Sequence, residues 1–288
     1  MQSATQSSDS SRPLHFQSKD GTKLFATLYP TAQPARANAL IVHGYGDHGG
    51  PYYEVARELN EIGLNALCLD LRGHGRSHGE RGFIASFEEY LEDVEAALAL
   101  LSEQCEDLEV LLVGHSNGGL IAMRLLADPF RCPKSIRAAV LSSPFLSLKI
   151  KAPAKSLFAQ VASRVLPKLS LPHKIEAELL SHDPEKIREH NHDTLGHDVV
   201  STRWFTEMSH AQRWVAEYAH RVTVPTLWLV SGLDEIAGPE QTRRVHARLK
   251  SESEYHEFPD MHHEVFNEVD RAKVFGLMKD FCSQKFHL

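Results

Sequence analysis

Short, continuously apolar runs alternate along this sequence with longer segments whose apolar positions recur at helical spacing. The apolar runs are Ala39–Val42, Leu64–Leu71, Val110–Val113, Ala138–Ser142 and Thr226–Val230. The segments with helical spacing are Tyr52–Ile62, Ser86–Glu103, Leu120–Ala127, Pro239–Leu249 and Arg271–Lys285. Apolar runs without alternation are typical of strands that are covered on both faces. The pattern therefore predicts an α/β fold, with a mostly parallel central sheet and helices on both faces.

Two stretches of the sequence do not follow the alternation of strands and helices, one at the start and one in the middle. Residues 1–13 are mostly polar, which predicts a flexible N-terminus. From 148 to 221 the sequence has helical segments and loops but no convincing strand. Because sites of open α/β sheets form beyond the carboxyl ends of the strands, we expect residues 148–221 to be a helical cap, or lid, over that edge. The predicted core then consists of residues 14–147 and 222–288.

A serine stands at a sharp turn between a predicted strand and a predicted helix. The sequence reads Gly-His-Ser-Asn-Gly-Gly from Gly114 to Gly119, with Ser116 at the turn. This context is typical of a nucleophile elbow. A side chain at so tight a turn has strained backbone angles, and the residues two before and two after it nearly touch, so Gly114 and Gly118 leave the necessary room. We therefore predict that Ser116 is a catalytic nucleophile.

A serine nucleophile requires a base and an acid that orients the base. Asp234 directly follows the strand that ends at Val230, and His263 follows a predicted strand at Tyr255–Phe258. The order Ser, Asp, His is the one expected for an elbow on this kind of sheet. Glu235 is an alternative acid, although the position of Asp234 after the strand favours Asp234. Spacing alone does not decide between His263 and the adjacent His262.

Ester hydrolysis also needs two N–H donors for the developing oxyanion. One donor should be the backbone N–H of Asn117, the residue after the serine. The other should come from the loop after the strand Ala39–Val42, where we choose Tyr45 in the sequence His-Gly-Tyr-Gly. The side chains of His43 and His115 are candidates for substrate contact, although packing around the elbow is the favoured role for both.

Composition limits the classes of partner. The net charge of −7 argues against a nucleic-acid partner. Four cysteines show no paired spacing, which favours free thiols in a reducing compartment. Neither a secretory signal nor a spanning apolar run is found. We therefore expect a cytoplasmic protein, with peripheral membrane contact left open, and the sequence is silent on oligomeric state.

The predicted cap contains two further features. Histidines crowd the stretch from His182 to His197, but a solvated loop is favoured over a zinc site, so we assign no metal and no cofactor. From Lys149 to Lys174 there are six basic residues and no acidic one. Apolar positions at helical spacing lie within this stretch, and the candidates for lipid contact are Leu157, Phe158 and Val161. This pattern fits transient contact with a membrane surface, whereas packing of the apolar face on the body is the favoured alternative.

Several segments resemble one known family. They are the loop His43–Gly46, the segment Asp70–Ser77 (Asp-Leu-Arg-Gly-His-Gly-Arg-Ser), the elbow, and His263–Glu268 (His-Glu-Val-Phe-Asn-Glu). The chain is similar from about Leu14 to Phe281 to the α/β-hydrolase superfamily, and within it to the monoacylglycerol lipase and lysophospholipase branch. The resemblance implies that the catalytic histidine is His263, and that the cap is mobile and holds the acyl chain.

The sequence departs from this family at three positions. Tyr45 stands where relatives usually carry a small residue, Asn117 where they often carry Met or Gln, and Asp260 where a Gly is usual. Tyr45 and Asn117 would act through backbone N–H groups, so the mechanism should survive, but a bulky Tyr45 could narrow the site.

We therefore predict a serine hydrolase that cleaves carboxylic esters of single-acyl lipids, foremost monoacylglycerols. A lysophospholipase or a general carboxylesterase is the alternative within enzymes. A non-catalytic binding protein on the same fold is less favoured, because such proteins usually lose a member of the triad.

Overall fold

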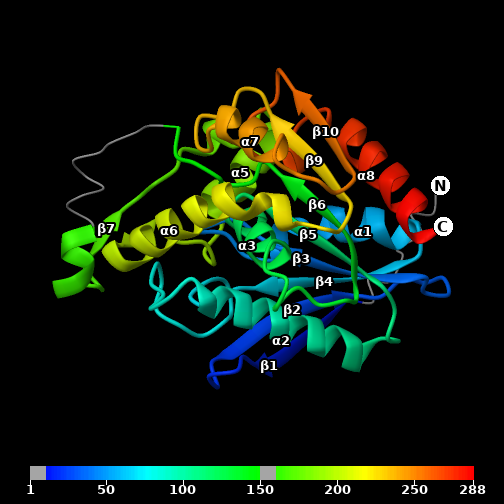
Figure 1. The fold of residues 1–288 in the computed structure, drawn as a ribbon, viewed down its shortest axis with the longest axis horizontal. Coiled ribbons are helices and arrows are strands. Elements are labelled where there is room, and N and C mark those ends of the chain that lie inside the picture. The colour runs from blue at the N-terminus through cyan, green and yellow to red at the C-terminus, as the bar shows by residue number, and fades with distance from the viewer. Residues whose placement is uncertain (1–10, 150–159) are drawn as a thin grey trace, which may run out of the picture.

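The computed structural model describes residues 11–149 and 160–288, and its centre is an eight-stranded sheet (Figure 1). The strands lie side by side in the order β1-β2-β4-β3-β5-β6-β9-β10. Their bounds are β1 Arg12–Gln17, β2 Lys23–Tyr29, β3 Ala37–Val42, β4 Leu64–Asp70, β5 Val110–His115, β6 Ile136–Ser142, β9 Thr226–Ser231 and β10 Ser253–Phe258. Within this sheet β2 runs opposite to the other strands, so its pairs with β1 and β4 are antiparallel, whereas the other five pairs are parallel; the sheet is mostly parallel, as predicted.

Helices cover both faces of the sheet. The helices of the core are α1 Tyr53–Glu61, α2 Glu88–Gln104, α3 Asn117–Leu126, α7 Pro239–His246 and α8 Arg271–Phe286, with one-turn 3-10 helices η1 Gly50–Tyr52 and η4 Val265–Asn267. The side chains of α1 and α8 belong to one apolar cluster and those of α2, α3 and α7 to the other. The sheet therefore separates two hydrophobic layers.

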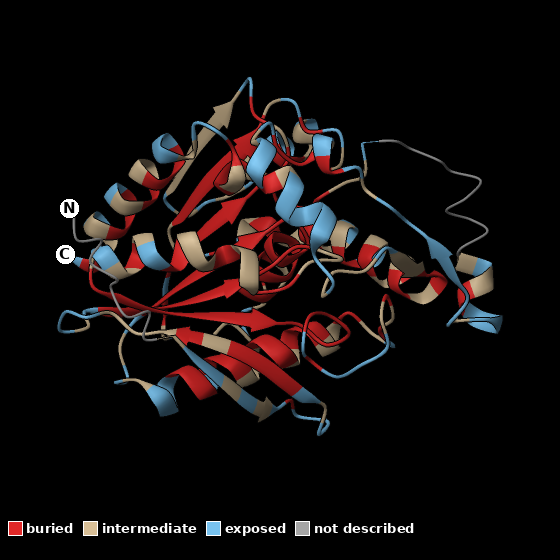
Figure 2. Cartoon of the chain, turned by 180° about the vertical axis from the view of Figure 1, so that it is seen from behind, coloured by how far each residue is buried: buried red, intermediate tan, exposed pale blue. Residues whose placement is uncertain are grey.

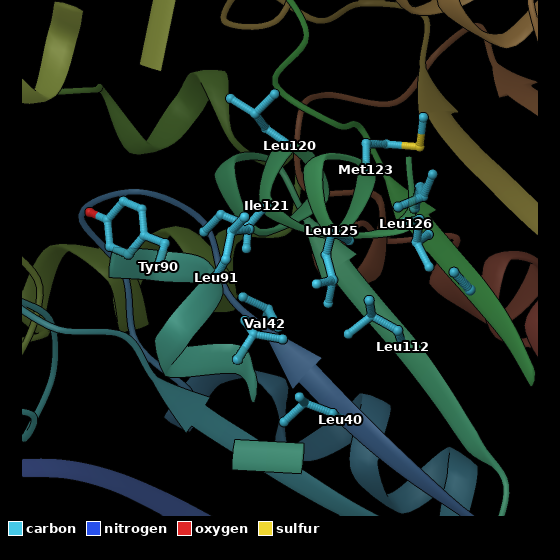
Figure 3. Packing of buried hydrophobic residues seen from close by; sticks show 14 of the residues in the cluster. Leu40, Val42, Tyr90, Leu91, Leu112, Leu120, Ile121, Met123, Leu125 and Leu126 are labelled. Carbon is cyan, nitrogen blue, oxygen red and sulfur yellow. The ribbon is translucent and has the colours of Figure 1, made fainter. Parts of the chain in front are cut away.

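Strand β3 shows why its apolar run is continuous. Leu40 and Val42 belong to the cluster under α2 and α3, whereas Ala39 and Ile41 belong to the cluster under α1 and α8. Successive side chains of a strand point to opposite faces, so a strand covered on both faces needs apolar residues at every position. Figure 3 shows Leu40 and Val42 beneath Ile121 and neighbouring side chains of α3. Strands β3, β4, β5 and β9 are buried over their whole lengths (Figure 2).

The predicted insertion 148–221 lies between β6 and β9. It contains η2 Ala177–Leu179, α5 Pro184–His192, α6 Thr202–Tyr218 and η3 Ala219–Arg221. Contrary to the expectation of no strand, β7 Ser170–Pro172 pairs antiparallel with β8 Val199–Ser201. Strands of three residues are too short to show a periodic pattern, so the sequence does not distinguish them from loops. The role of this insertion as a lid stays a prediction.

Strand β1 begins at Arg12, two residues before the predicted start of the core. Among the helices in the described part of the chain, none combines the length and the apolar character needed to cross a bilayer.

Candidate active site

Ser116 lies where β5 ends and α3 begins, at the carboxyl edge of the sheet. Its backbone has φ 50° and ψ −114°, a strained conformation for a residue with a side chain. A Cβ at Gly114 would lie 2.5 Å from the carbonyl oxygen of Gly118, and one at Gly118 would collide with the carbonyl oxygen of Val42. Both glycines are therefore required by close packing of the backbone around the serine.

Asp234 and His263 form a buried pair. The His263 Nδ1 donates to Asp234 Oδ2 at 2.7 Å, and both side chains are almost wholly buried. The other oxygen of Asp234 accepts the backbone N–H groups of Ile236 at 2.9 Å and Ala237 at 2.8 Å. Because these bonds fix the carboxylate, they also fix the tautomer of His263, whose Nε2 carries the lone pair in the neutral ring.

The surroundings of His263 raise its pKa above the ordinary value of 6.5. Burial alone would lower the pKa of His263, but the negative charge and the hydrogen bond of Asp234 outweigh it, and the charge of Glu264 adds to the rise. The imidazolium that forms when His263 takes a proton is therefore stabilised.

The structure separates the alternatives for the acid and the base. Glu235 forms an ion pair with Lys149 on the surface, with Oε1 2.6 Å from Nζ. The Nδ1 of His262 donates to the carbonyl oxygen of Glu178 at 2.7 Å. Asp234 and His263 are thus the two groups that the structure pairs with each other.

Ser116 and His263 line one cavity of about 430 Å³. Its wall is largely apolar and comes from the core and the insertion, including Phe145, Leu148, Val200, Phe205, Met208 and Ile236. Concave apolar sites with a few polar groups are typical of ligand pockets. The Ser116 hydroxyl and the His263 imidazole therefore share one cavity with a largely apolar wall.

The two predicted oxyanion donors lie beside the elbow. In the described part of the chain, the backbone N–H groups of Tyr45 and Asn117 make no hydrogen bond with the protein. The Tyr45 side chain turns to the insertion, where its hydroxyl donates to the carbonyl oxygen of Val199 at 2.7 Å and its ring centroid lies 3.7 Å from that of Trp204. The Asn117 side chain is fully buried, and neither of its polar atoms has a hydrogen-bond partner among the described residues.

His43 and His115 differ in their access to the cavity. His43 is fully buried and is not part of the cavity wall; its Nδ1 donates to the Gly44 carbonyl at 2.6 Å, and its Nε2 accepts the Leu71 N–H at 3.0 Å. Burial lowers the pKa of His43 to about 3. His43 is therefore a neutral support for the loop, not a substrate contact. His115 does line the cavity, and its Nδ1 lies 3.0 Å from Ser142 Oγ.

Of the three predicted lipid contacts in the insertion, only Val161 falls within the part of the chain that the structure describes. Leu157 and Phe158 lie outside the described residues. Val161 is 60% exposed and does not line the cavity.

The family-like segment after β4 supports the loop that carries Tyr45. Asp70 Oδ1 accepts the N–H of Gly49 at 2.7 Å, and its Oδ2 accepts the N–H of Arg76 at 2.8 Å. Gly75 has φ 51°, and a Cβ there would collide with the Asp70 carboxylate. The Arg-Gly-His-Gly sequence is therefore explained by structure, because this segment folds back onto the loop after β3 and supports it.

Sequence reasoning missed three acidic side chains in the cavity wall, Asp47, Asp198 and Glu264. Burial and then the negative charge of Glu264 raise the pKa of Asp47 well above its ordinary value. For Asp47 and Glu264, position in the sequence could have predicted a place near the site. Asp47 directly follows the His-Gly-Tyr-Gly loop, and Glu264 directly follows His263.

Comparison with known proteins identifies relatives along most of the chain. A profile of the family described as serine aminopeptidase, S33, matches residues 33–270. Human monoglyceride lipase is 30% identical over 272 residues, which are 89% of this chain and 88% of that protein. Phospholipase YtpA of Bacillus subtilis is 29% identical over 248 residues, covering 85% of this chain and 94% of that protein.

Solved structures agree with the sequence relatives. The crystal structure of Paleococcus ferrophilus monoacylglycerol lipase aligns with a TM-score of 0.82 at 29% identity, covering 91% of this chain and 99% of that one. With a strained serine elbow, an Asp–His pair and these relatives, the chain belongs to the S33 family of α/β-hydrolases, in its monoacylglycerol lipase branch, and is an ester hydrolase.

Proposed function

We propose that this protein hydrolyses monoacylglycerols to a fatty acid and glycerol, with Ser116, His263 and Asp234 as its catalytic triad. The observation that carries the proposal is the buried Asp234–His263 pair, whose histidine lines one apolar cavity together with the strained Ser116. The strain supports a nucleophile, since such backbone conformations persist where surrounding contacts hold them and cluster at active sites.

In the proposed mechanism, Ser116 Oγ attacks the ester carbonyl carbon while His263 Nε2 takes the hydroxyl proton. The backbone N–H groups of Tyr45 and Asn117 bind the oxyanion. His263 then gives the proton to the glycerol oxygen as the C–O bond breaks, leaving an acyl group on Ser116. A water molecule deprotonated by His263 attacks the acyl-enzyme, and the fatty acid leaves with Ser116 restored.

The charges in the cavity favour a neutral alcohol over a phosphate. Asp198 and Glu264 line the cavity beside Asp47, whose raised pKa favours its neutral form, and among the described lining residues there is no Lys or Arg. Burial lowers the pKa of His115, and lowers that of His197 to about 4, so neither ring adds positive charge at pH 7. A phosphate near the scissile ester would therefore be repelled, whereas glycerol hydroxyls can donate to the carboxylates.

The insertion is proposed to hold the acyl chain and to contact the lipid surface. Apolar side chains of α6, among them Phe205 and Met208, line the cavity. At the outer end of the insertion, which we call the cap tip (residues 160–171), large apolar side chains are exposed beside basic ones. The exposed apolar side chains are Val161, Val165, Leu166, Leu169 and Leu171. Apolar residues flanked by Lys and Arg are typical of segments that bind membrane surfaces.

A second candidate is cleavage of peptides at a free amino terminus, the activity in the description of the matched family. The carboxylates of Asp198 and Glu264 favour it, because they would also attract an ammonium group. The apolar wall of the cavity makes the lipid ester the better-supported substrate.

The test compares four substrates with one preparation of the full chain: a monoacylglycerol, the lysophosphatidic acid of the same acyl chain, the matching lysophosphatidylcholine and an amino-acid p-nitroanilide. We expect the monoacylglycerol to be cleaved at least tenfold faster than the phosphate-bearing lipids and the anilide not to be cleaved. Ser116→Ala should lose turnover and labelling by a fluorophosphonate. Faster turnover of either lysophospholipid, or labelling that persists in Ser116→Ala, would contradict the proposal.

A further inference from the structure

Two histidines and one glutamate from distant parts of the chain meet where the insertion touches the core. His182 lies between η2 and α5, His262 lies on the loop after β10, and Glu268 follows η4. The two imidazole ring centroids are 3.8 Å apart. One ring nitrogen of each histidine and one carboxylate oxygen of Glu268 all lie within 4.8 Å of one another.

Hydrogen bonds fix the tautomer of both rings. The Nδ1 of His262 faces the carbonyl oxygen of Glu178 at 2.7 Å, and the Nδ1 of His182 faces Glu268 Oε1 at 2.9 Å. A carbonyl and a carboxylate only accept, so each Nδ1 carries the hydrogen. In the neutral rings both Nε2 atoms then bear lone pairs, and in the described part of the chain neither Nε2 has a hydrogen-bond partner.

Glu268 is held rigidly behind His182. Its side chain is 3% exposed, and its oxygens accept the backbone N–H groups of His262 at 2.7 Å, His182 at 3.2 Å and Val269 at 3.2 Å. A carboxylate that binds the second nitrogen of an imidazole orients the ring and makes it a better metal ligand. His182 itself is 46% exposed on its side chain, so water and ions can reach it.

A second cluster of possible metal ligands has no free ring nitrogen. Asp47, His48 and Asp193 also lie within 4.8 Å of one another. The Nδ1 of His48 accepts the N–H of Gly50 at 3.0 Å, so its Nε2 carries the hydrogen and donates to Asp193 at 2.9 Å. Both ring nitrogens of His48 are occupied within the protein, and a metal ion would have to break one of these bonds.

We propose that His182 and His262 bind a zinc ion through their Nε2 atoms, with Glu268 as the carboxylate behind His182 and water completing the coordination. Zn²⁺ prefers imidazole nitrogens at about 2.0–2.1 Å, which places two ligands of a tetrahedral ion about 3.3 Å apart. The ion would join the insertion to the loop that carries His263, because His262 directly precedes that residue.

The test is calorimetric titration of the full-length protein with ZnCl₂. We expect one Zn²⁺ per chain, and affinity at least tenfold weaker in both His182→Ala and His262→Ala. Glu268→Gln should weaken binding by about 10–100-fold, the usual effect of losing a partner that orients a ligand. The matched control is His210→Ala, which removes an exposed histidine of α6 and should bind Zn²⁺ as the wild type does.

A second measurement separates loss of the site from loss of the fold. Zn²⁺ should raise the melting temperature of the wild type and of His210→Ala, whereas Mg²⁺ at the same concentration should not. His182→Ala should melt without zinc near the wild-type temperature, since this ring is partly exposed, and should show no zinc-dependent rise. Absence of stoichiometric binding in the wild type, or unchanged affinity in both alanine variants, would overturn the proposal. Neither result depends on the substrate that the enzyme cleaves.

Discussion

The elbow and the cap tip are both rich in apolar residues, but those of the elbow are buried whereas those of the cap tip are exposed. All six residues of β5 are buried, and so are nine of the ten residues of α3. In the cap tip, Val165 is 74% exposed and Leu166 is 57% exposed. The strained conformation of Ser116 persists because close packing on all sides over-determines it. The exposed side chains of Val165 and Leu166 are not enclosed in this way, so their apolar surface is available to an outside partner.

The comparison shows that the fixed geometry of the serine and the exposed apolar surface lie in separate parts of this molecule. A nucleophile has to be held in one geometry, since a misplacement of about 1 Å costs about 100-fold in rate. A surface that meets lipid needs exposed apolar area but no fixed geometry. Substitutions in the two regions should therefore affect different measurements.

The largest effect is expected for Asp234→Asn, which tests the rigid region. The amide would donate towards His263 Nδ1, so the ring would adopt the other tautomer and could not accept the Ser116 proton. We expect kcat for a soluble p-nitrophenyl ester to fall about 10⁴-fold. Glu235→Gln, beside it on the surface, is the control and should retain activity. Equal losses in the two variants would show that the acid has been assigned wrongly.

Next in size is Gly118→Ala. Its Cβ would collide with the carbonyl oxygen of Val42, so backbone has to move. We expect a loss of about 2–3 kcal/mol in the free energy of unfolding in urea, and about 100-fold or more in kcat/KM as Ser116 shifts.

Gly276→Ala is the matched control for Gly118→Ala. Gly276 lies within α8, and a Cβ there would meet no atom within 4 Å. This variant should gain about 0.5–1 kcal/mol, because Ala favours the helix. If Gly118→Ala were as stable as the wild type, tight packing would not explain the elbow.

The pH dependence comes third. Only neutral His263 can act as the base, and the charge and hydrogen bond of Asp234 raise its pKa against the opposing effect of burial. We therefore expect kcat/KM to rise with pH, with a midpoint above 6.5, and to fall about tenfold per unit of pH below that midpoint. Glu264→Gln removes one of the charges that raise this pKa, so its midpoint should move to lower pH. A wild-type midpoint at or below 6.5 would contradict the assignment.

A smaller and more selective effect is expected in the cap tip. Val165→Ser with Leu166→Ser removes two exposed apolar side chains, each worth about 1–2 kcal/mol when buried in lipid. Hydrolysis of monoacylglycerol in vesicles should fall about tenfold, whereas hydrolysis of a soluble ester should not change.

Phe130→Ser is the control for the cap-tip variant. Phe130 is 96% exposed and follows the end of α3 that is remote from Ser116. An equal loss from Phe130→Ser would show that exposed apolar area in general, not the cap tip, governs action on vesicles.

The smallest effect is expected for Asn117→Ala. The proposed oxyanion donor is the backbone N–H, which the substitution retains, so the turnover rate should change less than about threefold. Removing two buried polar atoms without partners should offset the lost packing, and the free energy of unfolding should change by less than about 1 kcal/mol. If turnover of the soluble ester instead fell by about 100-fold, the loss typical of a missing oxyanion donor, the side chain itself would have to take part.

The sequence by itself determined the order of strands and helices and the place of the elbow. Both follow from local rules: a strand covered on two faces needs apolar residues throughout, and a turn as tight as that at Ser116 needs glycine two residues away on either side. The same rules placed Asp234 and His263 after strands, because parallel strands bring their carboxyl ends to one edge.

Only the tertiary structure decided which side chains meet across the chain. It paired His263 with Asp234, put Asp47 beside Glu264, and brought His182 to His262. It also formed the short β7–β8 pair and left the cap tip exposed. Such contacts join residues far apart in sequence, and they depend on the packing of whole elements, whose directions no local pattern of polar and apolar residues encodes.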